Sequence, residues 1–354
     1  MIGLHATSDS MGGAWADAAI SERVGPTIIR TLLYVARTEL FIIISAFLLV
    51  MSLDRRPRGY TNVVKDQFVR LSIPFGFWTL FYAVYGLVKA THLGYSDSVV
   101  AELMSPSSWI GFLLLGDVKY HMHFIPTLFG VLLFFPLFVA SKNNPILGVC
   151  VIIGLAVKFE VDRVLYQSLW GTEALPYLVR TTKILSYVGY GMIAGSFFGL
   201  FSRIPFDELR KTAGPIAYVF ALLLLLKFCG AYLTVKDGAY PFTYRPAYWA
   251  DFLMPVFLFA LCMSLHTSFV SRRISNISHL SLGLYLVHPI ILDACEIYVT
   301  TLSSSPTIQV VMKILITIPS TFLLVLIIER SSLMSWTIGL RRSPKLHEAS
   351  PSSV

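Results

Sequence analysis

Residues 308–328 have the sequence IQVVMKILITIPSTFLLVLII, a run of 21 positions in which Lys313 is the only charged side chain. A run this long and apolar is typical of a helix that crosses a lipid bilayer, because about 20 helical residues span the hydrocarbon. Further apolar runs fill most of the chain on the N-terminal side of this one, and the shortest of them is 145–159. The nine predicted spans are residues 27–53, 71–91, 122–141, 145–159, 183–202, 213–233, 249–270, 280–299 and 308–328.

The composition agrees with this pattern. Of the 354 residues, 55% are hydrophobic and 14% are charged, and the mean hydropathy is +0.70, whereas a soluble domain carries about 25% charged residues. A water-soluble globular enzyme is therefore excluded. We predict an all-α fold, a polytopic transmembrane helix bundle in which residues 1–328 form one membrane domain. Residues 329–354 then form a cytoplasmic tail, and the Ser/Pro-rich stretch 343–354 is expected to be disordered.

The net charge of +8 does not indicate nucleic acid, since the Lys and Arg residues lie scattered between apolar spans and form no basic arm. They serve as topology signals, because Lys and Arg collect in cytoplasmic loops. Alternating loops divide cleanly into one set with 15 Lys and Arg residues and another with 6. This division predicts a cytoplasmic C-terminus and places residues 6–26 outside. The cysteines all fall in apolar spans without short spacing, so neither disulfides nor a zinc site are indicated: Cys150, Cys229, Cys262 and Cys295.

Ionisable side chains inside the spans are costly in hydrocarbon, so they are the first place to look for function. Arg37 and Glu39 fall in the first predicted span, two residues apart. Residues two apart on a continuous helix do not face each other. We therefore expect each to find a partner elsewhere, either in an interhelical salt bridge or in a functional site.

Two histidine segments stand out. Residues 120–126, YHMHFIP, lie at the outer mouth of the third span, where the spacing of His121 and His123 does not suit joint metal ligation on a helix, so no metal is predicted. A general base fits better, because an imidazole titrates near neutral pH. Residues 281–289, SLGLYLVHP, place His288 midway along a span, beside a proline and three residues after Tyr285 on the same helix face. A core histidine bonded to a neighbouring helix is the alternative for His288.

Four segments follow one another along the chain in a recognisable order. They are FIIISAFLL at 41–49, RLSIP at 70–74, YHMHFI at 120–125 and SLGLYLVHP at 281–289. In this order they resemble the motifs F-F-x-x-S-G-F-L-L, R-x-x-x-P, H-x-W-F-L and S-x-x-x-Y-L-x-H-P of the acyltransferase-3 family. That family comprises integral membrane O-acyltransferases that modify bacterial surface polysaccharides. No single motif is specific, so the resemblance rests on the ordered set.

Departures from the family pattern affect three places. Ala46 stands where the family usually has Gly, and His123 where it usually has Trp. The family's first helix carries a basic residue followed eleven positions later by a His; His5 matches the His, while the basic residue would fall before Met1. We therefore expect that a first helix ending near His5 extends upstream of Met1, which would give ten spans and two cytoplasmic termini. A nine-span protein with a short translocated N-terminus is the alternative.

The resemblance implies transfer of an acetyl or succinyl group from cytoplasmic acyl-CoA to a sugar hydroxyl of a polysaccharide or its lipid-linked precursor. His5 or His121 would serve as general base, with His288 as a further catalytic residue. Arg70 would attract the CoA phosphates, and Arg37 and Tyr285 would line the donor path. Ser45 belongs to the same path, either as an acyl carrier or as a helix-packing residue.

The resemblance also implies a location and partners. We expect a multi-pass protein of the bacterial inner membrane, in contact with the lipid bilayer, a lipid-linked glycan and polysaccharide assembly proteins. Two other classes stay open on the residues alone. A secondary transporter of an anionic sugar or acyl compound would also use intramembrane Arg, Glu and His residues. A scaffold subunit of a polysaccharide-export complex would use its polar spots for helix association only.

Overall fold

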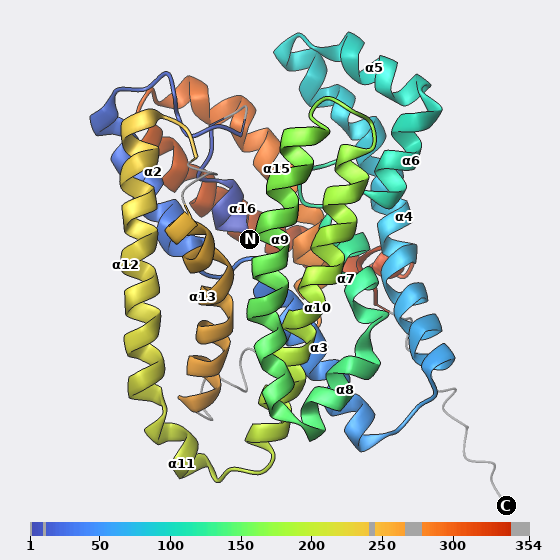
Figure 1. The fold of residues 1–354 in the computed structure, drawn as a ribbon. Coiled ribbons are helices and arrows are strands. Elements are labelled where there is room, and N and C mark those ends of the chain that lie inside the picture. The colour runs from blue at the N-terminus through green and yellow to red at the C-terminus, as the bar shows by residue number, and fades with distance from the viewer. Residues whose placement is uncertain (1, 10–11, 241–244, 266–277, 341–354) are drawn as a thin grey trace, which may run out of the picture.

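The protein is described here from a computed structural model, which describes residues 2–9, 12–240, 245–265 and 278–340. These residues form helices and connecting loops, with no β-strand among them, which confirms the predicted all-α class (Figure 1). The tail expected to be disordered, residues 343–354, lies outside the described residues. The helices are α1 Ile2–His5, α2 Ile20–Leu33, α3 Thr38–Arg55, α4 Tyr60–Leu93, α5 Ser96–Met104, α6 Pro106–Leu114, α7 Phe124–Leu132, α8 Phe135–Asn143, η1 Pro145–Val149, α9 Cys150–Ser168, α10 Leu175–Phe201, α11 Phe206–Lys211, α12 Ala213–Asp237, α13 Arg245–Ser264, α15 Ser281–Leu302, α16 Pro306–Arg330 and η2 Ser335–Ile338.

Within the described residues, seven helices are long and apolar enough to cross a membrane, and the bent pair α7 and α8 makes an eighth. Large apolar side chains cover their outer faces, as at Val84, Leu225 and Leu323, each at least 60% exposed. Such an outer surface fits lipid tails rather than water. The chain is thus a multi-pass membrane protein in contact with a bilayer.

The count of nine is not confirmed, and the difference lies in the predicted span 145–159. This stretch becomes η1 followed by the first half of α9, and α9 then continues to Ser168. The second half of α9 carries four charged side chains: Lys158, Glu160, Asp162 and Arg163. So many charges keep α9 from meeting the composition of a spanning helix.

The predicted span 27–53 is broken in two. Helix α2 ends at Leu33 and α3 begins at Thr38, so Arg37 is the N-cap residue of α3, with an extended backbone at φ −79° and ψ −177°. Its side chain therefore does not follow the helical spacing, and Arg37 Nε lies 3.3 Å from Glu39 Oε2. The expectation that these two residues cannot pair was wrong, because it assumed a continuous helix.

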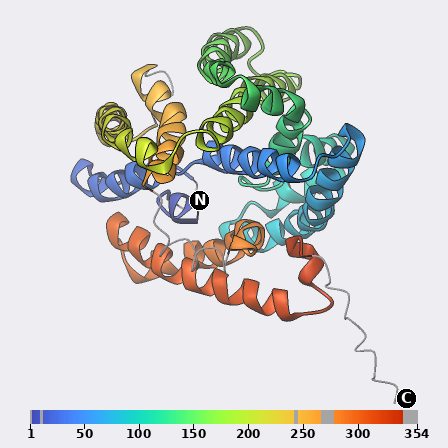
Figure 2. The same cartoon turned by 90° about the horizontal axis from the view of Figure 1, so that it is seen from below.

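Helix α10 is the central packing element of one half of the molecule and contacts α3, α7, α8 and α9. Its glycines allow this close approach, since a Cβ atom at Gly195 would lie 2.1 Å from the carbonyl oxygen of Phe138. Seen along the bundle in Figure 2, α16 and α15 form the opposite side, and the short α1 lies near the middle. The N-terminal helix is thus enclosed by the spans.

Contacts between loops agree with the charge-based topology. At one end, Lys142 pairs with Asp54, and Arg203 Nη2 donates to the carbonyl oxygen of Lys142 at 3.3 Å. At the other end, the hydroxyl groups of Ser8 and Tyr240 lie 3.4 Å apart. Figure 1 shows these ends as the bottom, with α8 and α11, and the top, with α5. Loops predicted to share a side therefore lie together, while the side that faces the cytoplasm stays a prediction.

Candidate active site

Three histidines from distant parts of the chain meet in the interior. His5 ends α1, His121 lies in the loop before α7, and His288 lies in α15. The ring centroids of His5 and His288 are 5.6 Å apart, with stacked rings, and those of His121 and His288 are 5.2 Å apart. The predicted catalytic histidines therefore form one cluster, with His288 in its middle.

Local sequence fixes the orientation of His288. Pro289 has no N–H group, so the carbonyl oxygen of Tyr285, four residues earlier, lacks its helical hydrogen bond. The Nδ1 atom of His288 lies 2.7 Å from this oxygen, and because a carbonyl only accepts, Nδ1 carries the proton. The other ring nitrogen, Nε2, is then left with a free lone pair.

Tyr285 also contacts the other histidine segment, residues 120–126, which carries His121. Its hydroxyl group donates a hydrogen bond to the backbone carbonyl oxygen of His121. Its ring lies 5.2 Å from the His121 ring between centroids. Tyr285 thus contacts both neighbouring histidines, one through its carbonyl oxygen and one through its hydroxyl group.

The cluster has buried nitrogen atoms without a partner among the described residues. They are Nε2 of His5, Nε2 of His288 and both ring nitrogens of His121. Buried polar groups in folded proteins nearly always have a partner, so such atoms call for an explanation. A site that receives a substrate provides one.

Three histidines outside the spans, His5, His121 and His123, are held neutral. Burial, followed by the neighbouring His288, lowers the pKa of His5 well below its ordinary value, and the same two causes lower the pKa of His121. Burial and then the charge of Lys183 lower the pKa of His123 to about 3. A neutral imidazole has a lone pair and can accept a proton.

A cavity of about 500 Å³ lies against the cluster, and we call it the histidine cavity. This volume is in the range of small-molecule sites. His5 lines it, whereas His121 and His288 lie behind and are fully buried. Other residues of its wall are Arg30, Arg37, Glu39, Lys119, His123 and Lys183.

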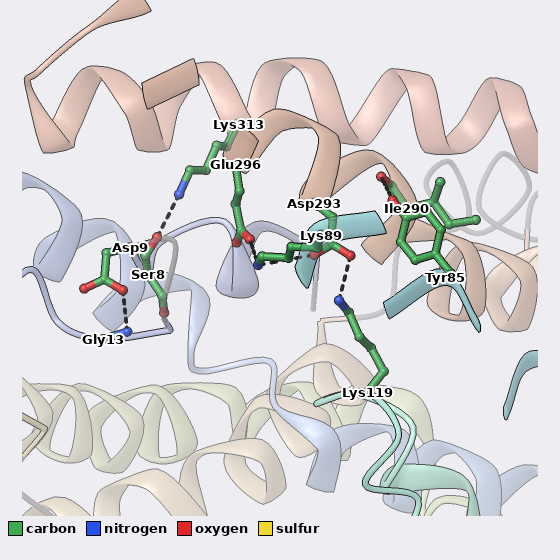
Figure 3. Close-up of polar contacts among 10 residues, drawn as sticks. All are labelled: Ser8, Asp9, Gly13, Tyr85, Lys89, Lys119, Ile290, Asp293, Glu296 and Lys313. Carbon is green, nitrogen blue, oxygen red and sulfur yellow. Dashed lines mark hydrogen bonds and ion pairs between the residues drawn. The ribbon is translucent and has the colours of Figure 1, made fainter. Parts of the chain in front are cut away.

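A network of ion pairs ties the histidine segments to the spans (Figure 3). Lys119 Nζ lies 2.6 Å from Asp293 Oδ2, and Lys89 pairs with Glu296 and lies 3.5 Å from Asp293 Oδ1. These pairs join α4 and α15 to the loop that carries His121. On the other side of the cluster, Lys313 Nζ donates to the carbonyl oxygen of Ser8 at 2.8 Å and holds the segment after α1.

A second cavity of about 310 Å³ lies beside the first, and we call it the α12 cavity. Lys227 of α12 and Asp251 of α13 form an ion pair in its wall. Arg30, Tyr34 and Arg37 line both cavities. The break between α2 and α3 therefore forms the partition between them.

The structure brings most of the predicted site residues together. His5, His121, His288 and Tyr285 form the cluster, and Arg37 lines the adjoining cavity. Ser45 and Arg70 do not belong to it. Ser45 lines neither cavity, and Arg70 is exposed on α4, where its Nη2 atom donates to Gln67 Oε1 at 2.6 Å.

Sequence reasoning missed the network around Asp293. A signal was present, since Asp293 and Glu296 are three residues apart and share a face of α15. For Lys119 there was none, because it lies in a loop and its partner is far away in sequence. Among the described residues, no group of three or more His, Cys, Asp or Glu side chains could hold a metal ion.

Comparison with known proteins adds a family to this geometry. The acyltransferase-3 family, described as an acyltransferase domain, matches residues 1–330 of the chain. No curated protein and no solved structure matches the chain. The matched region contains every helix of the histidine cluster and both cavities. The chain is therefore a member of the acyltransferase-3 family of membrane proteins.

Proposed function

We propose that this protein transfers an acetyl or succinyl group from acyl-CoA to a sugar hydroxyl of a cell-surface polysaccharide or its lipid-linked precursor. The observation that carries the proposal is the cluster of His5, His121 and His288, which has unpartnered ring nitrogens and borders the histidine cavity through His5. Family membership supports acyl transfer. The acyl group and the sugar acceptor are the proposed part.

His5 is the general base in this proposal, since it is the member of the cluster that lines the cavity. Its Nε2 lone pair takes the proton of the sugar hydroxyl, and the hydroxyl oxygen forms a bond to the thioester carbonyl carbon. The carbon–sulfur bond then breaks, and the CoA thiolate leaves and takes the proton back from the imidazolium. The products are a sugar ester and free CoA.

The negative oxygen formed during the attack needs a stabilising charge. Arg37 stands in the same cavity wall as His5 and supplies positive charge there. Preorganised charges of this kind stabilise a developing oxyanion strongly in a site without water. His288 and His121 support the base from behind as positioning residues.

The donor is proposed to enter from the cytoplasm. Arg70 lies roughly 28 Å from the cavity residue Lys89 along α4, at 1.5 Å per residue, and is exposed. There it would attract the CoA phosphates, while the pantetheine arm reaches inward past Ser45 and Tyr285. This arrangement fits a bacterial inner-membrane protein with a cytoplasmic C-terminus, which receives a lipid-linked glycan on its other side and works with polysaccharide assembly proteins.

The ester content of the surface glycan tests this function in cells. We expect glycan from cells with the gene to carry acetyl or succinyl esters that glycan from cells without the gene lacks. The gene with His5→Ala serves as the matched comparison and should restore no ester. Equal ester content with and without the gene would refute the proposal, and uptake of label without glycan modification would indicate a transporter instead.

A further inference from the structure

The walls of the two cavities carry more positive than negative charge. Six basic side chains line them: Arg30, Arg37, Lys89, Lys119, Lys183 and Lys227. Four carboxylates face these bases: Glu39, Asp251, Asp293 and Glu296. With all ten of these side chains ionised, the difference is two positive charges, because the nearby His5, His121 and His123 are held neutral.

Each of the four carboxylates already has a cation. Arg37 Nε lies 3.3 Å from Glu39 Oε2, and Arg37 Nη1 lies 3.9 Å from Asp251 Oδ2. Asp251 also pairs with Lys227. The hydroxyl group of Tyr187 donates to Glu39 at 2.5 Å. Asp293 and Glu296 are occupied by Lys119 and Lys89, as described above.

Arg30 is one of the two cations left over. Its three hydrogen bonds to described residues all use Nη1, and their acceptors are uncharged: the carbonyl oxygen of Leu4 and the hydroxyl oxygens of Thr7 and Ser8. Its guanidinium group lies 4.3 Å from the ring centroid of Tyr240. Nε and Nη2 have no hydrogen-bond partner among the described residues, although Arg30 borders both cavities.

Lys183 is the second cation that is left without a carboxylate partner. It lines the histidine cavity from α10 and forms neither an ion pair nor a hydrogen bond with a described residue. The ring centroid of Tyr187 lies 5.3 Å from its Nζ atom. Glu39 is the carboxylate whose charge acts on Lys183, although the two side chains form no ion pair. An ionised side chain inside a membrane bundle costs several kcal/mol unless it is compensated, so such residues usually mark a ligand path.

We infer that Arg30 and Lys183 form an anion-binding subsite, which receives a carboxylate or phosphate group of one of the two substrates. This inference rests on the proposed function and narrows its substrate class. Arg30 bonds to the carbonyl oxygen of Leu4, directly before His5, so the bound anion lies close to the general base. A guanidinium group and an ammonium group together hold such an anion by charge-assisted hydrogen bonds.

Two sources of the anion fit this place. One is the free carboxylate of a dicarboxylic acyl group, such as succinyl, and the other is an acidic group on the acceptor, either a uronic acid carboxylate or a phosphate. The phosphates of CoA do not fit, because the pantetheine arm separates them from the thioester that must meet the base. The subsite thus predicts that at least one substrate is anionic at its reacting end.

Binding of small anions to the purified protein in detergent tests the inference without any transfer step. The probes are succinate, methyl glucuronide and inorganic phosphate, with methyl glucoside as the neutral control, each titrated by calorimetry. The variants are Arg30→Gln and Lys183→Met, with Lys183→Arg to keep the charge. Lys211→Met is the matched control, because Lys211 is exposed and paired with Glu208 at the surface.

We expect at least one anion to bind and methyl glucoside not to bind. Arg30→Gln and Lys183→Met should each lower the affinity for that anion roughly tenfold to hundredfold, as for lost hydrogen bonds between charged groups. Lys183→Arg and Lys211→Met should keep the wild-type affinity. Succinate as the preferred probe assigns the anion to the acyl group, and glucuronide or phosphate assigns it to the acceptor. No anion binding to the wild type, or equal binding to both charge-removing variants, would overturn the inference.

Acyl transfer measured on the same samples separates this inference from the proposed function. Transfer by a wild type that binds no anion would contradict the subsite alone. Anion binding that Arg30→Gln and Lys183→Met abolish, in a wild type that esterifies no sugar, would contradict the proposed function alone and support the subsite.

Discussion

The imidazole of His5 stacks on the imidazole of His288, with ring centroids 5.6 Å apart and planes inclined by 23°. This contact joins the first helix of the described chain to α15 near its other end. The ring of Tyr120 also contacts His5, 4.3 Å away between centroids, and lies 6.5 Å from the ring of His288. The residue proposed as base is therefore packed against two rings, which restricts the orientation of its imidazole.

His288→Ala tests the role of this stacking. The variant removes the surface on which His5 rests and leaves the carbonyl oxygen of Tyr285 without its partner. We expect kcat to fall roughly 10²-fold with little change in KM, because a base displaced by about 1 Å loses this much. Steady-state kinetics measures it, and His92→Ala, at an exposed position of α4, should behave as wild type. An unchanged kcat in His288→Ala would show that His5 needs no support from behind.

Tyr285→Phe tests the link between α15 and the segment 120–126, which carries His121. The variant keeps the ring but removes the hydrogen bond to the carbonyl oxygen of His121. We expect a loss of about 1 kcal/mol in unfolding free energy together with a lower kcat, since the loop is then less well placed. Denaturation in detergent and kinetics measure the two effects. The exposed Tyr166 offers the control Tyr166→Phe; the prediction fails if both tyrosine variants behave alike.

The pair Lys119 and Asp293 is predicted to stabilise the loop before α7. Their side chains are 14% and 2% exposed, and removing one partner of a buried pair leaves an uncompensated charge at a cost of about 3 kcal/mol. We expect Asp293→Asn and Lys119→Met each to be destabilised, and the double variant to lose less than the sum. Thermal denaturation of all four proteins measures this coupling.

An exposed pair gives the reference for that cycle. Arg163 and Glu160 are both more than half exposed, so the same substitutions there should cost less than about 1 kcal/mol. Strict additivity at Lys119 and Asp293 would mean that the pair does not couple.

The pH dependence of folding stability should reflect His123, a buried histidine outside the spans. The pKa of His123 is lowered to about 3, while in the unfolded chain it is about 6.5. Above about 6.5 both states are neutral and the full stability is present. As the pH falls below that value the unfolded state takes up a proton first, so stability is lost at about 1.4 kcal/mol per pH unit until the pH reaches the folded pKa.

His123→Phe removes this proton uptake. We therefore expect the midpoint of thermal unfolding to fall less steeply between pH 7 and pH 5 in the variant than in the wild type. His92→Phe, at an exposed position, is the control and should keep the wild-type slope. Parallel curves for wild type and His123→Phe would show that His123 is not held neutral in the folded state.

Sequence alone predicted much of the bundle and part of the site. Eight of the nine predicted spans correspond to spanning helices or to the bent pair, because apolar length is a local property. His121 and His288 were found because polar residues in or beside apolar spans are conspicuous, and His5 was found through the family resemblance. Their meeting at 5.2 to 5.6 Å could not be predicted, since it depends on how three distant segments pack.

The errors have local causes. The break at residues 34–37 has neither Gly nor Pro to announce it, and it placed Arg37 outside the helix, where it reaches Glu39. The bend of 56° between α7 and α8 had a signal in Pro136, near the start of α8. The excess charge of Arg30 and Lys183 emerges only when every carboxylate is matched to a cation in space.

Transfer of label from radioactive acetyl-CoA or succinyl-CoA to glycan, by purified protein in lipid vesicles, tests the central claim most directly. We predict base-labile label in the glycan with the wild type, a rate roughly 10²- to 10⁴-fold lower with His5→Ala, and the wild-type rate with His92→Ala. A folded wild type that leaves the glycan unlabelled, or His5→Ala at full rate, would contradict the account.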